Sequence, residues 1–348
     1  MKHLKFLIGF ILLVLTALAS FGTFSLPRVE KGGSDRFSAE RASKHIEVMS
    51  KVPHSGEHPV ERAQVRRYLY DILEDMGGEP EIHEYDSIKF RYGGYFDIGN
   101  VYCQFDPLSG PADSYIMMVA HFDSRFRQTK LQKTVYSYGA GDDAYGVGSI
   151  LELLSQALKY RDEWHQGVRI LLTDSEENAL DGMKCAAKYN PELFENVGYV
   201  VNLESRGMNG PVLLFETSAN NENVLDLYSE AKAPYGYSLT TVVYRFLPNN
   251  TDFTIVKDSI PGINFSTIDN INYYHVDDDN FENINLATIQ HYGAQIEPIL
   301  EEFLTSGEYR DPDALKGDED LVFFTVPILG IFSFTKPQFT LFCSVVFA

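Results

Sequence analysis

Tyr-Ile-Met-Met-Val-Ala-His-Phe-Asp-Ser, residues 115–124, is an apolar run that ends abruptly in polar side chains. Its uninterrupted apolar part, Tyr115–Ala120, predicts a strand buried on both faces. A helical spacing of apolar residues follows at Tyr145–Tyr160, and a second apolar run lies at Val168–Thr173. This order of strand, helix and strand is typical of a sheet covered by helices on both sides.

The same alternation continues along the chain. Further apolar runs lie at Tyr199–Leu203, Val212–Phe215 and Gly262–Phe265, and helical spacing lies at Phe37–Met49, Val60–Met76, Gly182–Lys188, Asn223–Lys232 and Leu286–Leu304. We therefore predict an α/β fold: a three-layer α/β/α sandwich with a mixed, mostly parallel central sheet. A length of 348 residues fits one such catalytic domain with terminal appendages.

Composition excludes some partners. The net charge of −20 would repel a phosphate backbone, so we expect no nucleic-acid partner. Cys103, Cys185 and Cys343 are too few for a disulfide framework and lack metal-ligand spacing. One Cys103–Cys185 bridge stays open, although free buried thiols are the expectation.

The N-terminus predicts membrane targeting. Phe6–Leu26 is uncharged and mostly apolar, follows Lys2 and Lys5, and has about the ~20 residues that span a bilayer. We expect residues 1–26 to be a transmembrane anchor; a signal peptide cleaved after Ala17-Leu18-Ala19 is the alternative. Either reading places the remainder on the extracytoplasmic side, after a linker at 27–36.

The C-terminal part changes composition after the domain expected over 37–308. An acidic linker at 309–320 leads to residues 321–348, which are rich in Leu, Val, Phe and Ile, with Lys336 as their one charge. We predict a second membrane segment there, in a chain that is a truncated piece of a longer protein. A final strand or core helix is the alternative.

Acidic and imidazole side chains follow the predicted strands, where ligands gather in parallel sheets. These positions are His121-Phe122-Asp123, Asp174-Ser175-Glu176-Glu177, Glu204, the loop residues Tyr274-His275, and Gly139-Ala140-Gly141-Asp142-Asp143 before a helix. Singly, each has an ordinary explanation, such as a helix cap or a solvated pair. Together, so many carboxylates would repel one another unless cations lay among them. Oxygen ligands with two imidazoles and no thiolate favour zinc over manganese or cobalt, with one carboxylate bridging two ions.

The ordered motifs resemble one family. They are Ala120–Ser124, Gly141–Gly146, Glu176-Glu177, Asn202–Glu204, and Tyr274-His275 with Asp279. This pattern resembles the di-zinc aminopeptidases, a family that includes secreted bacterial aminopeptidases, glutamate carboxypeptidase and glutaminyl cyclase. The resemblance extends from about Phe37 to Phe303 and implies a zinc-exopeptidase fold with two Zn²⁺ per chain.

The resemblance also implies roles. Asp142 would bridge the ions, with His121 and Glu204 completing one ligand set and Glu177 and His275 the other. Glu176 would be the general base. Tyr274 would donate to the developing oxyanion, although Tyr273 and Tyr274 could equally be packing aromatics, and Tyr273 is a candidate substrate contact.

Three further aspartates belong to the predicted surroundings of the metals. Asp123 is placed to hold the second ring nitrogen of His121, with helix capping as the alternative. Asp143 occupies a position where the family often has a strained peptide bond, and Asp279 completes the last motif.

One departure narrows the resemblance. Many members have Asp where this chain has Glu204, and glutamate is the form in the endoplasmic-reticulum and vacuolar membrane branch. Glu204–Gly207 and Asn250–Phe253 also resemble that branch. The resemblance thus implies a membrane-anchored protein with an extracytoplasmic catalytic domain.

The expected function is aminopeptidase activity on peptides with a free N-terminus, because acidic surroundings suit a cationic amine. A carboxypeptidase or dipeptidase is the first alternative; it would need a cation for the C-terminal carboxylate, and Arg206 is the candidate, unless it forms a structural salt bridge. Single-zinc glutaminyl cyclisation and a catalytically dead receptor-like ectodomain are the others.

Overall fold

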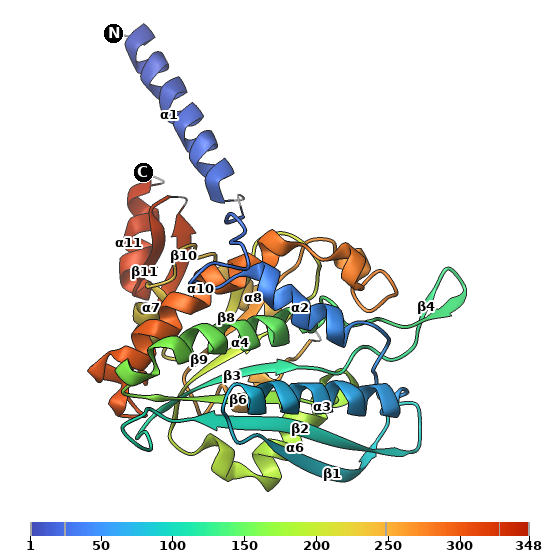
Figure 1. Ribbon diagram of the computed structural model, residues 1–348. Coiled ribbons are helices and arrows are strands. Elements are labelled where there is room, and N and C mark those ends of the chain that lie inside the picture. The colour runs from blue at the N-terminus through green and yellow to red at the C-terminus, as the bar shows by residue number, and fades with distance from the viewer. Residues whose placement is uncertain (1, 24–25, 248, 327, 347–348) are drawn as a thin grey trace.

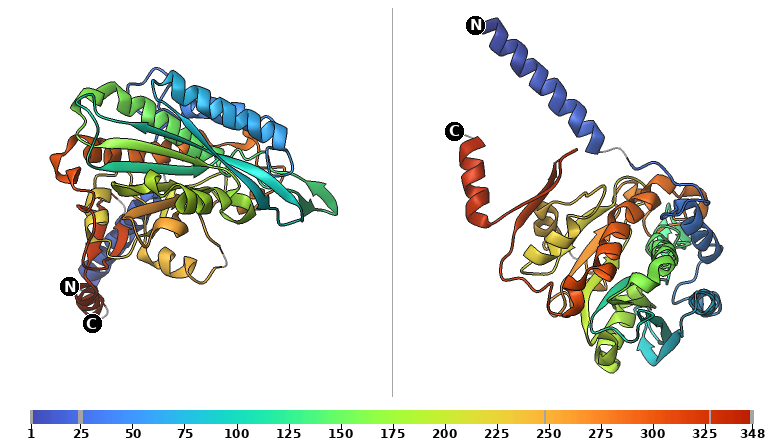
Figure 2. Two further views of the ribbon diagram at one scale, coloured as in Figure 1. Left: turned by 90° about the horizontal axis from the view of Figure 1, so that it is seen from below. Right: turned by 60° about the vertical axis from the view of Figure 1, so that its left-hand side comes forward.

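The computed structural model describes residues 2–23, 26–247, 249–326 and 328–346. Its body has three layers, with helices on both faces of a central sheet (Figures 1 and 2). The sheet has seven strands in the order β1-β2-β6-β3-β7-β9-β8. The strands are β1 (Glu81–Lys89), β2 (Tyr95–Phe105), β3 (Tyr115–His121), β6 (Gly167–Thr173), β7 (Val197–Leu203), β8 (Leu213–Thr217) and β9 (Gly262–Ser266).

The middle of the sheet is parallel and its two edges are antiparallel. Strands β6, β3, β7 and β9 pair in parallel, whereas β2 on one side and β8 on the other run the opposite way; β1 pairs antiparallel with β2 and so runs in the direction of the central strands. All seven residues of β3 are buried. The prediction of an α/β fold with a mixed central sheet is therefore confirmed, and the parallel pairings lie at its centre.

Helices cover each face of the sheet according to the alternation of side chains along the strands. On β3, Ile116 and Met118 contact the core under α2, α4, α7 and α10, while Met117 and Val119 contact the core under α6 and α9. The helices are α2 (Ala39–Met49), α3 (Pro59–Asp75), α4 (Ala144–Ala157), α5 (Glu176–Ala179), α6 (Asp181–Tyr189), α7 (Glu222–Tyr228), α8 (Ser238–Tyr244), α9 (Phe253–Val256) and α10 (Leu286–Thr305).

Helix α4 lies at the centre of the larger core. Nearly all of its residues are buried, because the sheet lies on one side and α2 and α10 on the other. Asp143 caps its N-terminus by accepting from the Gly146 N–H at 3.1 Å. The helix thus begins at a fixed point directly beside Asp142.

The N-terminal residues form helix α1 (Lys2–Thr23), which stands away from the body (Figure 1). No helix within the described residues is both long and apolar enough to cross a membrane. Residues 1, 24–25, 327 and 347–348 of the two predicted membrane segments lie outside the described part of the chain.

The first part of the stretch predicted as a second membrane segment, 321–348, is not helical. The chain there forms a hairpin, β10 (Val322–Val326) with β11 (Gly330–Phe334), followed by the 11-residue helix α11 (Lys336–Val346). In β10 burial alternates, with Phe323 and Thr325 inward. Thr325 N–H donates to the Gly236 carbonyl. Burial of every second residue is typical of a strand that packs on a protein surface. The apolar composition of the segment did not indicate this alternation.

The thiols of Cys103, Cys185 and Cys343 are free. The Cys103–Cys185 bridge that the sequence left open is therefore absent, and both of these thiols are buried.

We predict that His291, on α10, makes the domain less stable at acid pH. Its Nδ1 accepts from the Val212 N–H at 2.9 Å, and its Nε2 donates to the Ala233 carbonyl at 2.8 Å. The bond that Nδ1 accepts needs the neutral ring, because a protonated Nδ1 has no free lone pair, and burial lowers the pKa of His291 to about 4. The unfolded chain takes up this proton below pH ~6.5. Stability from this site is thus complete above that pH and is lost progressively as the pH falls to about 4.

Urea unfolding at pH 7 and at pH 4.5 measures the loss. From pH 7 to pH 4.5, the free energy of unfolding should fall by about 2 kcal/mol more for the natural chain than for His291→Asn, which has no titrating group there. An identical pH dependence for the two proteins would contradict the prediction.

Candidate metal centre and active-site cleft

Neighbouring parallel strands bring the predicted ligands to one edge of the sheet. His121 is the last residue of β3, Glu177 follows β6, and Glu204 follows β7. Since β6 and β7 flank β3, the carboxyl ends of these strands lie side by side. Asp142 reaches the same place from the turn before α4, and His275 from the loop after the short 3₁₀-helix η3 (Ile271–Tyr273).

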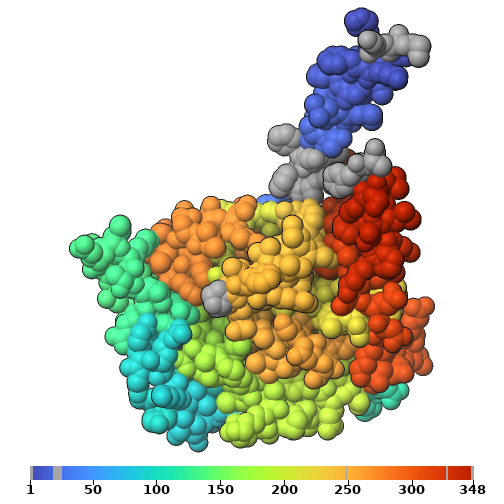
Figure 3. Space-filling model, turned by 180° about the vertical axis from the view of Figure 1, so that it is seen from behind, coloured from blue at the N-terminus to red at the C-terminus, as the bar shows by residue number. Residues whose placement is uncertain are grey.

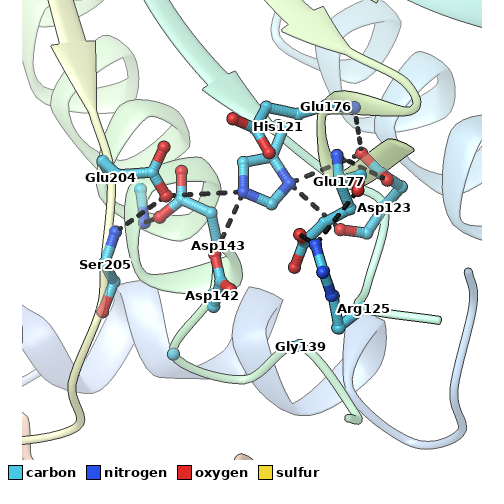
Figure 4. Close-up of polar contacts among 12 residues, drawn as sticks. His121, Asp123, Arg125, Gly139, Asp142, Asp143, Glu176, Glu177, Glu204 and Ser205 are labelled. Carbon is cyan, nitrogen blue, oxygen red and sulfur yellow. Dashed lines mark hydrogen bonds and ion pairs between the residues drawn. The ribbon is translucent and has the colours of Figure 1, made fainter. Parts of the chain in front are cut away.

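The five side chains converge as two groups that share Asp142. Four of them, His121, Asp142, Glu177 and Glu204, are labelled in Figure 4. In the first group, His121 Nε2 lies 3.1 Å from Asp142 Oδ1 and 3.5 Å from Glu204 Oε1. In the second, His275 Nε2 lies 3.1 Å from both Asp142 Oδ2 and Glu177 Oε1. Each oxygen of the Asp142 carboxylate therefore faces a different histidine.

The second group consists of buried polar atoms that lack hydrogen bonds. Within the described residues, three atoms have no hydrogen-bond partner: Asp142 Oδ2, Glu177 Oε1 and His275 Nε2. The two oxygens nevertheless each lie 3.1 Å from the nitrogen. Buried polar atoms are rarely left unsatisfied. Short distances without hydrogen-bond alignment are expected of ligand atoms aimed at a common ion, so the residues present fit a metal.

The electrostatics of the site call for positive charge. Burial opposes protonation of His121, yet hydrogen bonds to Asp123, Asp142 and Glu204 outweigh it and raise its pKa. Burial raises the pKa of Glu204, and the charge of Asp142 adds to this rise. A cation would compete with the protons that the imidazole and the Glu204 carboxyl bind more strongly here than in water. The donor set, nitrogen and oxygen without sulfur, suits zinc.

Asp123 combines the two roles that the sequence left open. Its backbone carbonyl accepts from His121 Nδ1 at 3.0 Å, and its carboxylate Oδ1 lies 3.4 Å from the same nitrogen. The carboxylate also accepts from the N–H groups of Glu176 and Glu177 at the start of α5. Since a carbonyl can only accept, Nδ1 carries the proton and Nε2 is free to face the candidate metal.

Asp143 and Asp279 shape the turn that presents Asp142. The peptide bond between Asp142 and Asp143 is cis. Asp279 accepts from Ser137 Oγ at 2.7 Å and from the Gly141 N–H at 2.5 Å. Neither side chain belongs to the two ligand groups. Both instead accept hydrogen bonds from backbone N–H groups close to Asp142, those of Gly146 and Gly141.

An open cleft of about 550 Å³ lies over the two groups. Glu176 and Tyr274 line it beside Glu177, Glu204 and His275. The Tyr274 ring stacks on His275, with 3.5 Å between the ring centroids. Seen from behind, this face is built from segments around residues 176–190, 240–256 and 270–285 (Figure 3).

Two predicted substrate residues differ in position. Arg206 lines the cleft, with its Cζ 5.0 Å from the centre of the Tyr274 ring. Tyr273 does not line it within the described residues; it packs against the main core, which agrees with the alternative of a packing aromatic.

Sequence reasoning missed three side chains of this site. Arg125 pairs with Glu177 Oε2 at 2.5 Å, so this glutamate keeps only Oε1 for the ligand group. Tyr292 donates to the Glu204 carbonyl at 2.6 Å, and Tyr244 lines the cleft. Arg125 could have been found because it directly follows the first motif, whereas Tyr292 is one more apolar position of a helix.

Comparisons with known proteins agree with this geometry. Residues 100–300 match the model of peptidase family M28. The chain is 30% identical over 260 residues to endoplasmic reticulum metallopeptidase 1 of Homo sapiens, a match that covers 72% of this chain and 27% of that relative. It is 27% identical over 210 residues to the vacuolar membrane protease of Saccharomyces cerevisiae (strain YJM789), covering 59% of this chain and 20% of that protein.

A solved structure shows the same fold. The aminopeptidase from Aneurinibacillus sp. strain AM-1 superposes with a TM-score of 0.62 at 13% identity, over 82% of this chain and 99% of that one. This chain spans about a quarter of the length of the curated relatives named above. The family model matches more than half of the chain, and together with the 30% identical relative it shows that this chain belongs to peptidase family M28.

Proposed function

We propose that the chain is a zinc-dependent aminopeptidase that binds two zinc ions. One observation carries the proposal: the Asp142 carboxylate divides its oxygens between two histidine–carboxylate pairs. His121, Asp142 and Glu204 would hold one ion, and Asp142, Glu177 and His275 the other. When bound, the zinc ions polarise the scissile carbonyl and make water acidic enough to lose a proton near neutral pH.

Glu176 is the proposed general base. Its carboxyl lines the cleft beside the ligand groups but belongs to neither, so it is free to exchange a proton. The Asp123 carboxylate fixes its backbone by accepting from its N–H at 2.9 Å. Glu176 would take a proton from the attacking water and deliver it to the leaving amine.

Tyr274 is the proposed donor to the oxygen on which negative charge develops. Burial raises the pKa of its hydroxyl, and the charge of Asp142 adds to this rise, so the phenol keeps its proton. Stacking on His275 fixes the ring at the edge of the cleft. A donor positioned in advance stabilises the transition state without reorganisation.

We predict that Glu176→Gln lowers kcat by about 100-fold to 10,000-fold, because the amide cannot accept the proton. Hydrolysis of leucine p-nitroanilide by the zinc-loaded protein measures kcat, and elemental analysis measures zinc per chain. The variant should keep the two zinc ions of the natural chain.

The matched control is Asp142→Asn, which weakens the shared ligand. It should lose zinc as well as activity, unlike Glu176→Gln. Turnover at the natural rate in Glu176→Gln with zinc retained would remove Glu176 as the base, and one zinc per chain would favour glutaminyl cyclisation.

The free α-amine is the proposed mark of the substrate. Glu176 and Glu204 line the cleft, where their carboxylates would attract a cationic amine. We predict that N-acetylation of a tetrapeptide lowers kcat/KM at least about 100-fold, as loss of a charge-assisted hydrogen bond and its partner would, whereas C-amidation leaves hydrolysis intact. The reverse pattern, measured by chromatography of the products, would make the enzyme a carboxypeptidase.

We also propose that the N-terminal segment holds the protein at a membrane with the catalytic domain on the extracytoplasmic side. The relatives' names refer to reticulum and vacuolar membranes, and Lys2 and Lys5 precede the exposed apolar residues of α1. In sealed vesicles from expressing cells, the catalytic domain should resist a protease added to the cytoplasmic face and be cut once detergent is present. Cleavage before detergent would contradict this orientation.

A further inference from the structure

Arg206 is an unpaired cation at the edge of the candidate metal centre. It follows the ligand Glu204 by two residues and lines the cleft. Within the described chain it forms no ion pair, and its Nε is buried without a hydrogen-bond partner. The salt bridge that would make it a structural residue is therefore not found there, and a desolvated guanidinium without an anion is unfavourable.

The other cations that line the cleft are accounted for. Arg125 is paired with the ligand Glu177. Lys184 is exposed and donates to a backbone carbonyl, and Arg91 is exposed and lies over a phenylalanine ring. Arg206 differs from Arg125 because it has no ion pair within the described residues, and from the exposed Arg91 and Lys184 because its Nε is buried without a hydrogen-bond partner.

One tyrosine lies beside the guanidinium, and a second lines the same cleft. The Arg206 Cζ stands 5.0 Å from the centre of the Tyr274 ring, which itself stacks on the proposed ligand His275. The Tyr244 hydroxyl is also buried without a partner within the described residues. Burial raises the pKa of the Tyr244 hydroxyl and the charge of Arg206 opposes the rise, so the two groups are within electrostatic reach. Stacking orients the guanidinium but leaves its N–H donors unused.

These groups form a set of donors without an acceptor. The Arg206 guanidinium offers several N–H donors and the Tyr244 hydroxyl one more. The matching ligand is a carboxylate, the anion that peptides supply, since a guanidinium binds its two oxygens side by side.

We propose that Arg206 and Tyr244 bind a carboxylate of the substrate close to the scissile bond. This inference rests on the proposed peptidase function and names the substrate class: short peptides that carry a carboxylate on the residue beside the bond. The carboxylate is either the free C-terminus of a dipeptide or an acidic side chain. An aminopeptidase with this site would prefer anionic substrates in spite of the negative charge of the chain.

The test compares four peptides: Ala-Leu, Ala-Leu-amide, Ala-Glu-amide and Glu-Leu-amide. The first supplies a C-terminal carboxylate, the second none, and the last two an acidic side chain on either side of the bond. In the natural full chain, at least one carboxylate peptide should have a kcat/KM about 10-fold to 100-fold above that of Ala-Leu-amide, as a charge-assisted pair provides. Which peptide is preferred identifies the source of the carboxylate.

The variants assign that preference to a residue. The ratio of kcat/KM for the preferred carboxylate peptide to kcat/KM for Ala-Leu-amide should fall to near one in Arg206→Gln, mainly through a change in KM. Arg206→Lys should retain part of this preference. Tyr244→Phe should reduce the ratio less than Arg206→Gln. Arg91→Gln, which removes another cleft arginine, should keep it. Thermal melting shows whether each variant is folded.

Equilibrium binding separates this inference from the peptidase function. Calorimetry of the Glu176→Gln protein with the preferred peptide and with Ala-Leu-amide needs no turnover. Tighter binding of the carboxylate peptide that disappears when Arg206→Gln is added supports the inference, even if no peptide is hydrolysed and the proposed function fails. No carboxylate preference, one that survives Arg206→Gln, or one lost in Arg91→Gln would overturn it.

Discussion

Repulsion among buried carboxylates is the constraint on which the rest of this structure depends. Asp142, Glu177 and Glu204 converge from three parts of the chain within hydrogen-bonding distance of two imidazoles. Arg125 neutralises one carboxylate of this group, by pairing with Glu177. The remaining negative charge sits in the interior, where it is costly unless cations bind. A fold that tolerates such a cluster must hold it rigidly from outside, and the surrounding hydrogen bonds do so.

The sheet explains how the cluster is assembled. Parallel strands β6, β3 and β7 end at one edge, so residues that are distant in sequence arrive there together. The buried helix α4 brings Asp142 to the same edge, and Asp279 fastens the turn before it. The antiparallel edge strands contribute no ligand; β2 instead anchors the sheet end, where the Gly99 N–H donates to buried Asp174 at 2.9 Å.

The sequence predicted the parallel centre and the five converging side chains because both rest on strong local signals. Continuous apolar runs marked β3, β6 and β7, and motifs marked their ends. The hairpin of β1 and β2 was missed because β1 is largely exposed and alternates little. The hairpin of β10 and β11 was not the expected structure because composition reports apolarity but not period, and Phe323 and Thr325 face inward while their neighbours do not. Tyr292 and Tyr244 reach the site only through the tertiary fold, which no spacing encodes.

The bond from Asp279 to the Gly141 N–H joins residues 138 positions apart in sequence. Both belong to the turns that present Asp142 and His275, so neither turn reaches its final form before the other has been synthesised. A nascent chain that ends before β9 therefore lacks His275 of the second ligand group as well as Asp279, so the centre can be completed only after residue 279 has been synthesised.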